Sequence, residues 1–408
     1  MVAPQALIEL EAARAAVLDP ITPLESEAVE LARSLGRRVA GPVRSTDPVP
    51  AFDNSAMDGF AVRSADTTGA RGERPVWLEL AGESRAGHPS EAGLDPGQAM
   101  TISTGAVIPE GADSVVPLED AVREKGRVGI GVDPPPGLHI RRPGEDVAPG
   151  SEVISSGTVI GPAEQGVLAS VGAGSVSCYR RPRVAVLSSG DELIGPGDPM
   201  RPGAVRNSNS FSISGLVRES GAEVVLNEIV RDEPAATREA IGAAVAADLV
   251  VVCGGVSVGE HDHVKGALID LGFEQRFWRI ALKPGKPTWF GRRGETLAFG
   301  LPGNPVSAMV TFLLLARPAL TALGGGLPDR RRIRARLAAD RAQTPGRTEA
   351  VRCRIEPGEG GWTAEPTGAQ GSHILTSILG ADGLVLVPPG EGTIEAGETV
   401  EVELIGHG

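Results

Sequence analysis

The 408-residue sequence predicts a multi-domain protein of the α/β plus β class. Three observations indicate this class. Apolar strands alternate with helical segments between residues 183 and 323, at the length expected of parallel crossovers. Short strand-like runs punctuated by Gly and Pro fill residues 75–133, and more short strands, with no good helix between them, follow residue 330. A chain of this length exceeds one simple core, so roughly two to four domains are expected.

Composition and charge limit the class of function. Hydrophobic residues make up 41% and charged residues 22%, as in ordinary globular proteins. The net charge of −13 argues against a nucleic-acid binder, although a local basic pocket for an anion remains compatible with it. The three cysteines form no CxxC pair, which disfavours a zinc site or a disulfide framework. The amino terminus is unlike a signal peptide and no apolar run reaches about 18 residues, so we expect a cytoplasmic protein without a membrane span.

The amino-terminal segment is expected to form two helices. Residues 4–18 have an amphipathic pattern. A second helix is expected to begin at Thr22, with Pro23 at its first position and Glu25 completing a capping box, and to end at Gly36. Neither segment carries evident chemistry, so packing or subunit contact is the favoured role.

Two polar segments flank the β-rich region. The loop 49–63 (VPAFDNSAMDGFAVR) is either a turn bonded to its own backbone or an acidic loop presented to a cation or a partner site, and both interpretations stay open. The hydroxyl groups of Thr101, Ser103 and Thr104 could donate hydrogen bonds to an anion, or these residues could only stabilise a strand, and both interpretations stay open. The Pro-rich segment 133–150, which contains Asp146, is taken alone a charged linker.

The α/β region is expected to begin after a short helix at 161–173. The predicted strands are 183–189, 223–230, 247–255 and 297–299. The predicted helices between and after them are 207–221, 232–246, 260–272 and 305–323. The tail opens with a basic run at 330–341 and continues with strands near 350–355, 383–387 and 399–404, which fits an all-β domain of about 80 residues.

The ends of the predicted strands gather groups that can bind phosphate and metal. GGVSVG (254–259) follows a strand and precedes a helix, where backbone N–H groups can surround a phosphate. Carboxylates follow the strands and lysines follow at KPGKP: Asp191, Glu192, Asp232, Glu260, Asp262, Lys283 and Lys286. Taken singly, each acid could have a purely structural role, because acidic residues stabilise the first turn of a helix. Together with a phosphate site they suggest Mg²⁺, which binds oxygen ligands and substrate phosphate.

Seven motifs in order give a family resemblance: DNSAMDG, STGAVIPEGAD, IRRPGED, SSGDEL, GGVSVGEHD, KPGKP and GLPGNPVSA. The chain resembles the molybdopterin molybdenumtransferase (MoeA) family, which is related to the E domains of gephyrin and of plant Cnx proteins. The resemblance extends from the DNSAMDG loop to QGSHI near Ser372. It implies molybdenum cofactor biosynthesis, in which molybdate is inserted into adenylylated molybdopterin and AMP is released with assistance from Mg²⁺.

The resemblance also implies four domains per chain in a homodimer. These are a helical or extended dimerisation domain (1–46 with 147–179), a β-rich lid domain (47–146), a three-layer α/β molybdopterin-binding domain (180–326) and a small C-terminal β-barrel domain (327–408). Expected partners are adenylylated molybdopterin and molybdate as substrates, with contacts to molybdopterin adenylyltransferase and apo-molybdoenzymes. Neither nucleic acid nor a membrane is expected as a partner.

The family's important residues are carried onto matching positions. The expected catalytic residues are Asp58, Asp146, Glu192, Asp232, Asp262, Lys283 and Lys286. The expected substrate-binding residues are Thr104, Gly254, Gly255, Ser257, Gly259, Arg279, Pro302, Pro305, Arg352 and Ser372. Mg²⁺ is the expected cofactor, with Glu192 and Asp262 as its ligands, while Lys283, Arg352 and Ser372 would hold the molybdate dianion. Phe60, His261 and His263 depart mildly from the family pattern without changing these acids and lysines.

Other functions stay open at this point. The adenylyltransferase of the preceding step shares the α/β domain, and gephyrin-like relatives act as scaffolds. A nucleotide-sugar or pyrophosphatase activity on the same α/β fold is a weaker alternative, against which the DNSAMDG and tail motifs count. The sequence decides neither between molybdate and tungstate nor whether a paralogue shares the role or which apo-enzymes receive the product.

Overall fold

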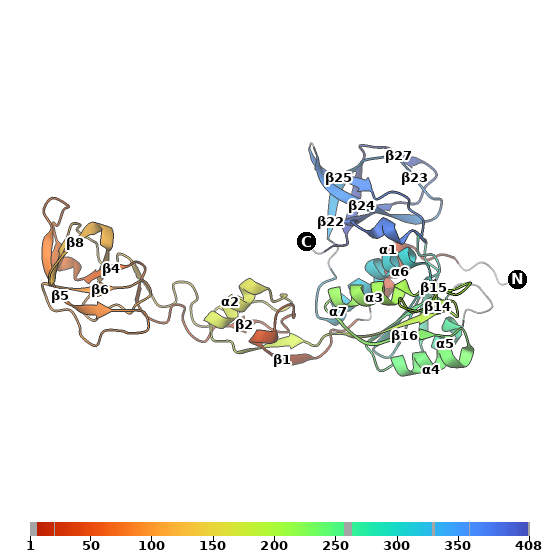
Figure 1. The fold of residues 1–408 in the computed structure, drawn as a ribbon, viewed down its shortest axis with the longest axis horizontal. Helices are drawn as coiled ribbons and strands as arrows, with labels where there is room; N and C mark the ends of the chain where they lie inside the picture. Colours follow the sequence, from red (N-terminus) through yellow and green to blue (C-terminus); the bar gives the residue numbers. More distant parts are fainter. Residues whose placement is uncertain (1–5, 20, 257–262, 329–330, 359, 407–408) are drawn as a thin grey trace. The chain divides into compact units, whose positions relative to one another are not determined.

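The computed structural model describes residues 6–19, 21–256, 263–328, 331–358 and 360–406 (Figure 1). The chain forms two compact units. Unit 1 comprises Met1–Glu27, Gly36–Ala40 and Ser177–Gly408, and unit 2 comprises Ala28–Leu35 and Gly41–Val176. The finer division into four domains stays a prediction.

The centre of unit 1 is a six-stranded sheet with the order β16-β13-β17-β21-β20-β18. The first four strands are parallel, and β20 and β18 complete the sheet in antiparallel orientation. The strands are β13 (Arg183–Ser189), β16 (Glu223–Val230), β17 (Leu249–Cys253), β18 (Glu274–Trp278), β20 (Trp289–Arg293) and β21 (Thr296–Leu301). The predicted parallel strands are therefore confirmed, and β18 and β20 add an edge that the sequence had not indicated.

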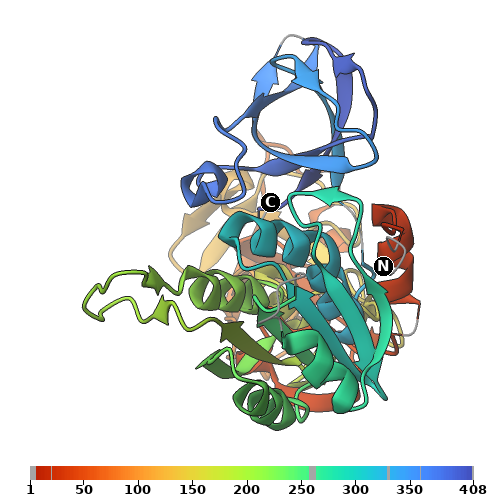
Figure 2. The ribbon, with the colours of Figure 1, turned by 90° about the vertical axis from the view of Figure 1, so that its right-hand side faces the viewer.

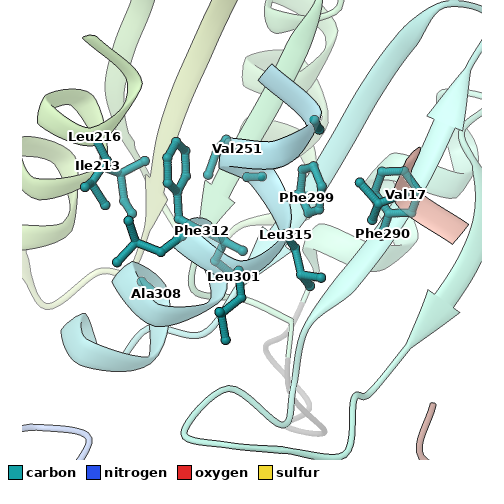
Figure 3. Packing of buried hydrophobic residues seen from close by; sticks show 14 of the residues in the cluster. Val17, Ile213, Leu216, Val251, Phe290, Phe299, Leu301, Ala308, Phe312 and Leu315 are labelled. Carbon is teal, nitrogen blue, oxygen red and sulfur yellow. The ribbon is translucent and has the colours of Figure 1, made fainter. Parts of the chain in front are cut away.

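The sheet is covered by helices on both faces, which gives the expected three layers. Alternate residues of β13 and β17 enter two separate cores: Val184 and Val251 face one side, whereas Ala185 and Val252 face the other. Figure 3 shows the first core, where Ile213, Phe299 and Phe312 pack together. The helices of unit 1 are α1 (Leu10–Leu18), α3 (Ser208–Glu219), α4 (Pro234–Ala244), α5 (Val264–Asp270), α6 (Pro305–Thr311) and α7 (Arg317–Leu323).

Local sequence signals place several of these helices. Asn207 caps α3, because its side chain accepts the N–H of Ser210 at 3.1 Å. Pro305 occupies the first turn of α6. The predicted helix 260–272 is described from Val264 onward, and its acidic start lies outside the described residues.

Residues Pro305–Leu323 form one continuous helical segment, because a π-helical turn, η4 (Phe312–Ala316), joins α6 to α7. This segment is long and apolar enough to cross a membrane, contrary to the expectation that no run reaches that length. However, 72% of its apolar window is buried inside the protein, as in the core helix of a globular domain. Figure 3 shows Ala308, Phe312 and Leu315 of this segment packed against the sheet.

The amino-terminal predictions need correction. The first helix begins at Leu10 rather than near residue 4, because Ile8 forms a parallel bridge with Ile280. The predicted second helix is wrong. Residues Ser26–Glu30 form strand β1, and a short 3₁₀ turn, η1 (Leu31–Arg33), follows. The reason is a distant partner, since β1 pairs with β12 (Ser175–Tyr179).

Unit 2 is β-rich, as predicted. Its main sheet has the order β7-β4-β6-β5-β9-β8. These strands are β4 (Gly59–Val62), β5 (Val76–Ser84), β6 (Gln98–Ile102), β7 (Ser114–Pro117), β8 (Ala121–Glu124) and β9 (Arg127–Ile130). Two separate two-stranded sheets are formed by β2 (Val43–Arg44) with β11 (Glu152–Ile154) and by β3 (Asn54–Ser55) with β10 (Ile140–Arg141). The predicted helix at 161–173 is α2 (Pro162–Ser170).

The C-terminal region is a closed five-stranded barrel, which confirms the expected small β-barrel. Its strands follow the order β24-β25-β22-β28-β26, and pairing of β24 with β26 closes it. The strands are β22 (Arg332–Leu337), β24 (Thr348–Gly358), β25 (Gly361–Pro366), β26 (Gly383–Val387) and β28 (Thr399–Leu404). Figure 2 shows these strands, in blue, curving around the barrel core. The short strand β19 (Leu282–Lys283) pairs with β24 and so links the α/β layer to the barrel.

Candidate functional site

A glycine turn follows β17 at the carboxyl end of the sheet. Gly254 and Gly255 have φ angles of +93° and +64°. A Cβ at Gly254 would lie 2.6 Å from the Ser189 carbonyl oxygen, and one at Gly255 would lie 2.5 Å from a Val264 methyl group. Only glycine fits both the backbone angles and the space. Ser257, Gly259 and Asp262, which were predicted to complete this loop, lie outside the described residues.

Carboxylates gather at the neighbouring strand ends, as the sequence predicts. Asp232, after β16, accepts the Ser189 hydroxyl at 2.6 Å. Its backbone N–H donates to Asp191 at 3.3 Å. Glu192 folds back over Gly190, since a Cβ on Gly190 would lie 2.5 Å from Glu192 Oε2. Three acids from two adjacent strands therefore lie near the glycine turn.

These carboxylates form an incomplete oxygen-ligand set. Among the described residues, no three His, Cys, Asp or Glu side chains come together as a metal centre. Mg²⁺ is commonly held by one or two carboxylates together with substrate phosphates. Because Glu192, Asp191 and Asp232 do not converge on one point, one or two of them at most could be ligands of such an ion, together with substrate phosphate.

The cationic residues of unit 1 lie in two places, at the junction with the barrel and around Trp278, whose indole N–H donates to Val256 after the glycine turn. Lys283 lies on β19 and its Nζ is 3.3 Å from Glu349 Oε2 of the barrel. Lys286 is exposed. Arg279, which has a positive φ of 71°, stacks on the Trp278 ring at 4.3 Å, and Lys265 lies over the same ring at 3.5 Å. Lys283 is thus held by the barrel rather than by the strand-end carboxylates.

Arg352 of β24 is fully buried, and only part of its guanidinium is bonded. Its Nε and Nη2 donate to the Ser377 hydroxyl at 3.2 and 2.9 Å, and Nη2 also donates to the Gly371 carbonyl at 3.4 Å. Its Nη1 has no hydrogen-bond partner within the described part of the chain. Burial lowers the pKa of Arg352 to about 10, so the group stays positively charged at neutral pH.

Ser372 brings the barrel segment next to the LPGNP loop after β21. Asn304 donates to the Ser372 hydroxyl at 3.2 Å, and the Val306 N–H donates to its carbonyl at 3.3 Å. Asn209 of α3 donates to the Gly303 carbonyl at 2.8 Å, while its own oxygen is buried without a partner in the described residues. Pro302 is buried within this loop, and Pro305 starts α6. Ser372 of the tail and the two LPGNP prolines, which were predicted from separate motifs, therefore lie in one contiguous region, and Gly371 connects it to Arg352.

Unit 2 carries the other predicted site residues. Asp58 Oδ1 accepts the backbone N–H of Thr104 at 2.6 Å and its hydroxyl at 3.0 Å. These two bonds lower the pKa of the exposed Asp58 carboxyl. Asp146 lies where residues 140–147 run alongside residues 49–55, and its N–H donates to the Val49 carbonyl at 3.0 Å. Asp58 and Thr104, from two distant motifs, thus form one group.

Several residues around the site were missed by sequence reasoning. Ser377 holds Arg352, Trp278 donates to the Val256 carbonyl at 3.0 Å, and Glu349 binds Lys283. One signal was present for Glu349: it directly precedes the predicted strand AVRCRI, whose alternate residues Val351, Cys353 and Ile355 are apolar, and an acid on the apolar side of a strand is unusual. Ser377 and Trp278 have no comparable local signal, because their partners are distant in sequence.

Unit 1 thus combines a sheet that carries a glycine turn and acids at its parallel strand ends with a barrel that contains a buried, partly unbonded arginine. Models of three protein regions match almost the whole chain. They are "MoeA N-terminal region (domain I and II)" at 8–172, "Probable molybdopterin binding domain" at 185–322 and "MoeA C-terminal region (domain IV)" at 334–405. The chain belongs to the MoeA family.

Similar proteins cover the full length. A molybdopterin molybdenumtransferase of Haemophilus influenzae is 36% identical, over 98% of this chain and 99% of the relative. Molybdopterin molybdenumtransferase 2 of Mycobacterium tuberculosis is 37% identical, over 92% and 94%. The crystal structure of a molybdopterin biosynthesis MoeA protein from Pyrococcus horikoshii has 33% identity and a TM-score of 0.84, over 98% of this chain and 99% of that one.

Proposed function

We propose that this protein is a molybdopterin molybdenumtransferase, which inserts molybdate into adenylylated molybdopterin and releases AMP. The relatives with this activity in their names match both ends of the chain as well as the α/β domain. That full-length match favours the transferase over the adenylyltransferase of the preceding step, for which the α/β domain alone would suffice.

The observation that carries the proposal is the unbonded Nη1 of Arg352. A buried donor without an acceptor costs about 1–3 kcal/mol, and more when it is charged. A ligand oxyanion would remove that cost, because a charged donor forms strong hydrogen bonds with oxyanion oxygens. The Ser372 hydroxyl, one residue after Gly371, and the Lys283 ammonium are the further donors that we assign to molybdate.

The adenylylated pterin is assigned to the carboxyl end of the sheet. Gly254 and Gly255 leave the backbone open to a phosphate, because no side chain covers them. The buried and unpaired oxygen of Asn209 adds an acceptor beside the LPGNP loop. Ligands of open α/β sheets bind at this edge as a general rule.

Mg²⁺ is assigned to Glu192, with Asp191 and Asp232 nearby and with Asp262 as a predicted further ligand. When bound, the ion would act as a Lewis acid on the phosphate that leaves as AMP. The protein's own contribution is to hold these carboxylates in place, and the Ser189 hydroxyl does this for Asp232.

Asp58, Thr104 and Asp146 are assigned to the reaction from unit 2. Because the Thr104 bonds lower its pKa, Asp58 is ionised at neutral pH and suits a role as a hydrogen-bond acceptor or electrostatic partner. We further assign a cytoplasmic homodimer that contacts molybdopterin adenylyltransferase and apo-molybdoenzymes. Exposed apolar side chains on unit 2, Leu35, Val159 and Val167, support a subunit contact, and light scattering of the purified chain tests it.

The function is tested by a turnover assay with two alternative substrates. Purified protein is given adenylylated molybdopterin with Mg²⁺, with and without molybdate or tungstate, and AMP is followed. Oxyanion-dependent AMP release is expected, with no consumption of ATP when unmodified molybdopterin is supplied instead. ATP consumption without oxyanion-dependent AMP release would reassign the protein to the preceding step. The absence of both AMP release and ATP consumption would favour a scaffold without enzymatic activity.

A further inference from the structure

Glu349 is a buried carboxylate to which the proposed mechanism gives no role. It lies on β24, directly opposite Lys283 of β19 in the parallel ladder. Its side chain is only 4% exposed. An ionised carboxylate at such burial is costly unless it is paired and hydrogen-bonded, so its partners indicate its purpose.

The partners of Glu349 are two cations and a hydroxyl. Arg341 donates to Oε1, and Thr344 donates to Oε2 at 3.1 Å. Lys283 Nζ donates to Oε2 at 3.3 Å and to the Thr344 hydroxyl at 3.4 Å. Burial alone would raise the pKa of Glu349, but the bonds and charges of Arg341 and Lys283 outweigh it and hold the pKa below its usual value.

Lys283 is fixed on one side and open on the other. Two of its three ammonium donors point to Glu349 and Thr344, yet 46% of its side chain is exposed. A lysine held in this way loses less side-chain entropy when it binds a ligand than a freely rotating lysine does. Glu349 therefore directs the ammonium while leaving a donor for an incoming anion.

Arg352 lies on the same strand as Glu349 but does not contact it. The two residues are three positions apart on β24, about 10 Å along the strand, so their side chains point to opposite faces. Glu349 is paired with Lys283 and Arg341, which leaves one positive charge in excess. The group around Glu349 therefore still attracts an anion.

We infer that Glu349 is a positioning residue for the oxyanion site, which orients the Lys283 ammonium toward an incoming anion. This inference rests on the proposed function. It assigns Glu349 no contact with the reacting atoms, since the residue acts through Lys283.

The direction in which Glu349→Gln changes the molybdate affinity tests the inference. If Glu349 acted only through its negative charge, Glu349→Gln would make the pocket more positive and tighten molybdate binding. If Glu349 positions Lys283, the same change weakens binding, by about tenfold for the loss of one charge-assisted hydrogen bond. Molybdate binding to the full-length protein is measured by calorimetry, and AMP release is measured against both substrate concentrations.

The matched variants separate positioning from folding. Glu274→Gln removes a carboxylate charge from an exposed ion pair with Arg276 and should leave the molybdate affinity unchanged. Glu349→Asp keeps the charge at a shorter reach and should fall between wild type and Glu349→Gln. In a Lys283→Met background, Glu349→Gln should have no further effect on the molybdate affinity.

The outcomes are distinguishable. A rise in the molybdate dissociation constant and in its KM, with the KM for the pterin unchanged, would support the inference. Equal or tighter binding by Glu349→Gln, or an undiminished effect in the Lys283→Met background, would overturn it while leaving the proposed function intact. A wild-type protein that neither binds molybdate nor releases AMP in response to it would overturn both.

Discussion

Arg352 shows how single contacts prepare the oxyanion site. Its guanidinium is fully buried, and the Ser377 hydroxyl accepts two of its N–H bonds while donating to the Ile374 carbonyl at 2.6 Å. Ser377 thereby fixes the plane of the guanidinium, and the unbonded Nη1 takes a defined direction. The same principle applies to Asp58, whose carboxylate is fixed by both donors of Thr104.

Ser377→Ala is expected to weaken oxyanion binding without removing any group that touches the ligand. The loss of the hydroxyl leaves Nε and part of Nη2 unpaired and lets the guanidinium rotate. We expect the KM for molybdate to rise by about tenfold, the scale of one hydrogen bond to a charged group. Ser377→Thr, which keeps the hydroxyl, should retain most of the affinity, and equal KM values for Ala and wild type would contradict this role.

Thr104→Val is expected to change the pH dependence of turnover. The valine keeps the backbone N–H but removes the hydroxyl, so one of the two bonds that lower the pKa of Asp58 is lost. That pKa should rise toward its ordinary value of 3.8, and Asp58 should therefore become protonated at a higher pH. The acidic limb of the pH–rate profile and a ¹³C carboxyl titration should both move upward in pH. A titration that stays at the wild-type position would show that the hydroxyl has no influence.

Helix α1 is the element that fastens the α/β layer to the barrel. Arg14, 2% exposed, donates both to Glu403 of β28 at 2.7 Å and to the Leu314 carbonyl at 3.1 Å, within the π-helical turn η4. Arg317 of α7 donates to the Leu404 and Ile405 carbonyls from the same side. These bonds connect α1, the helical segment 305–323 and the last barrel strand, which keeps Arg352 and Ser372 aligned with the LPGNP loop.

Arg14→Met should therefore destabilise the protein strongly. It leaves Glu403 as a buried carboxylate without its main partner, and such a change costs about 3–5 kcal/mol. Denaturant unfolding followed by fluorescence measures the loss. Arg276→Ala removes an exposed ion pair with Glu274 and should change stability by less than about 1 kcal/mol. An Arg14→Met/Glu403→Leu double variant should recover much of the loss, and a single variant as stable as Arg276→Ala would refute the role of this contact.

Over the whole molecule, local signals predicted more than distant ones. The parallel strands, the helix after Asn207 and the barrel strands follow from residue patterns within a few positions, and the structure has them. The helix expected after Thr22 failed because Ser26–Glu30 pairs with Ser175–Tyr179, a partner that no local pattern contains. Propensity and capping signals yielded to that pairing.

The residues of the candidate site likewise comprise some that local motifs predicted and others that depend on distant partners. Gly254, Gly255 and the acids at the strand ends were identified from their motifs, and Asp58 with Thr104 from two others that the fold joins. The environment of Lys283 was not predictable, because Glu349, Arg341 and Thr344 reach it through the pairing of β19 with β24. A residue that positions another side chain is hard to identify from one sequence, because its role depends on a partner that only the tertiary structure brings into contact.

The most direct test of the central claim, that the buried Arg352 guanidinium binds the oxyanion, is the molybdate dependence of AMP release in Arg352→Met and wild type. Adenylylated molybdopterin is kept saturating, and pterin binding and thermal stability are measured in parallel. We expect wild-type AMP release to saturate with molybdate. The variant should still bind the pterin, but its kcat/KM for molybdate should fall by about 100-fold or more, as for the loss of a charged group that contacts its ligand. A folded variant with the wild-type molybdate response would contradict the claim.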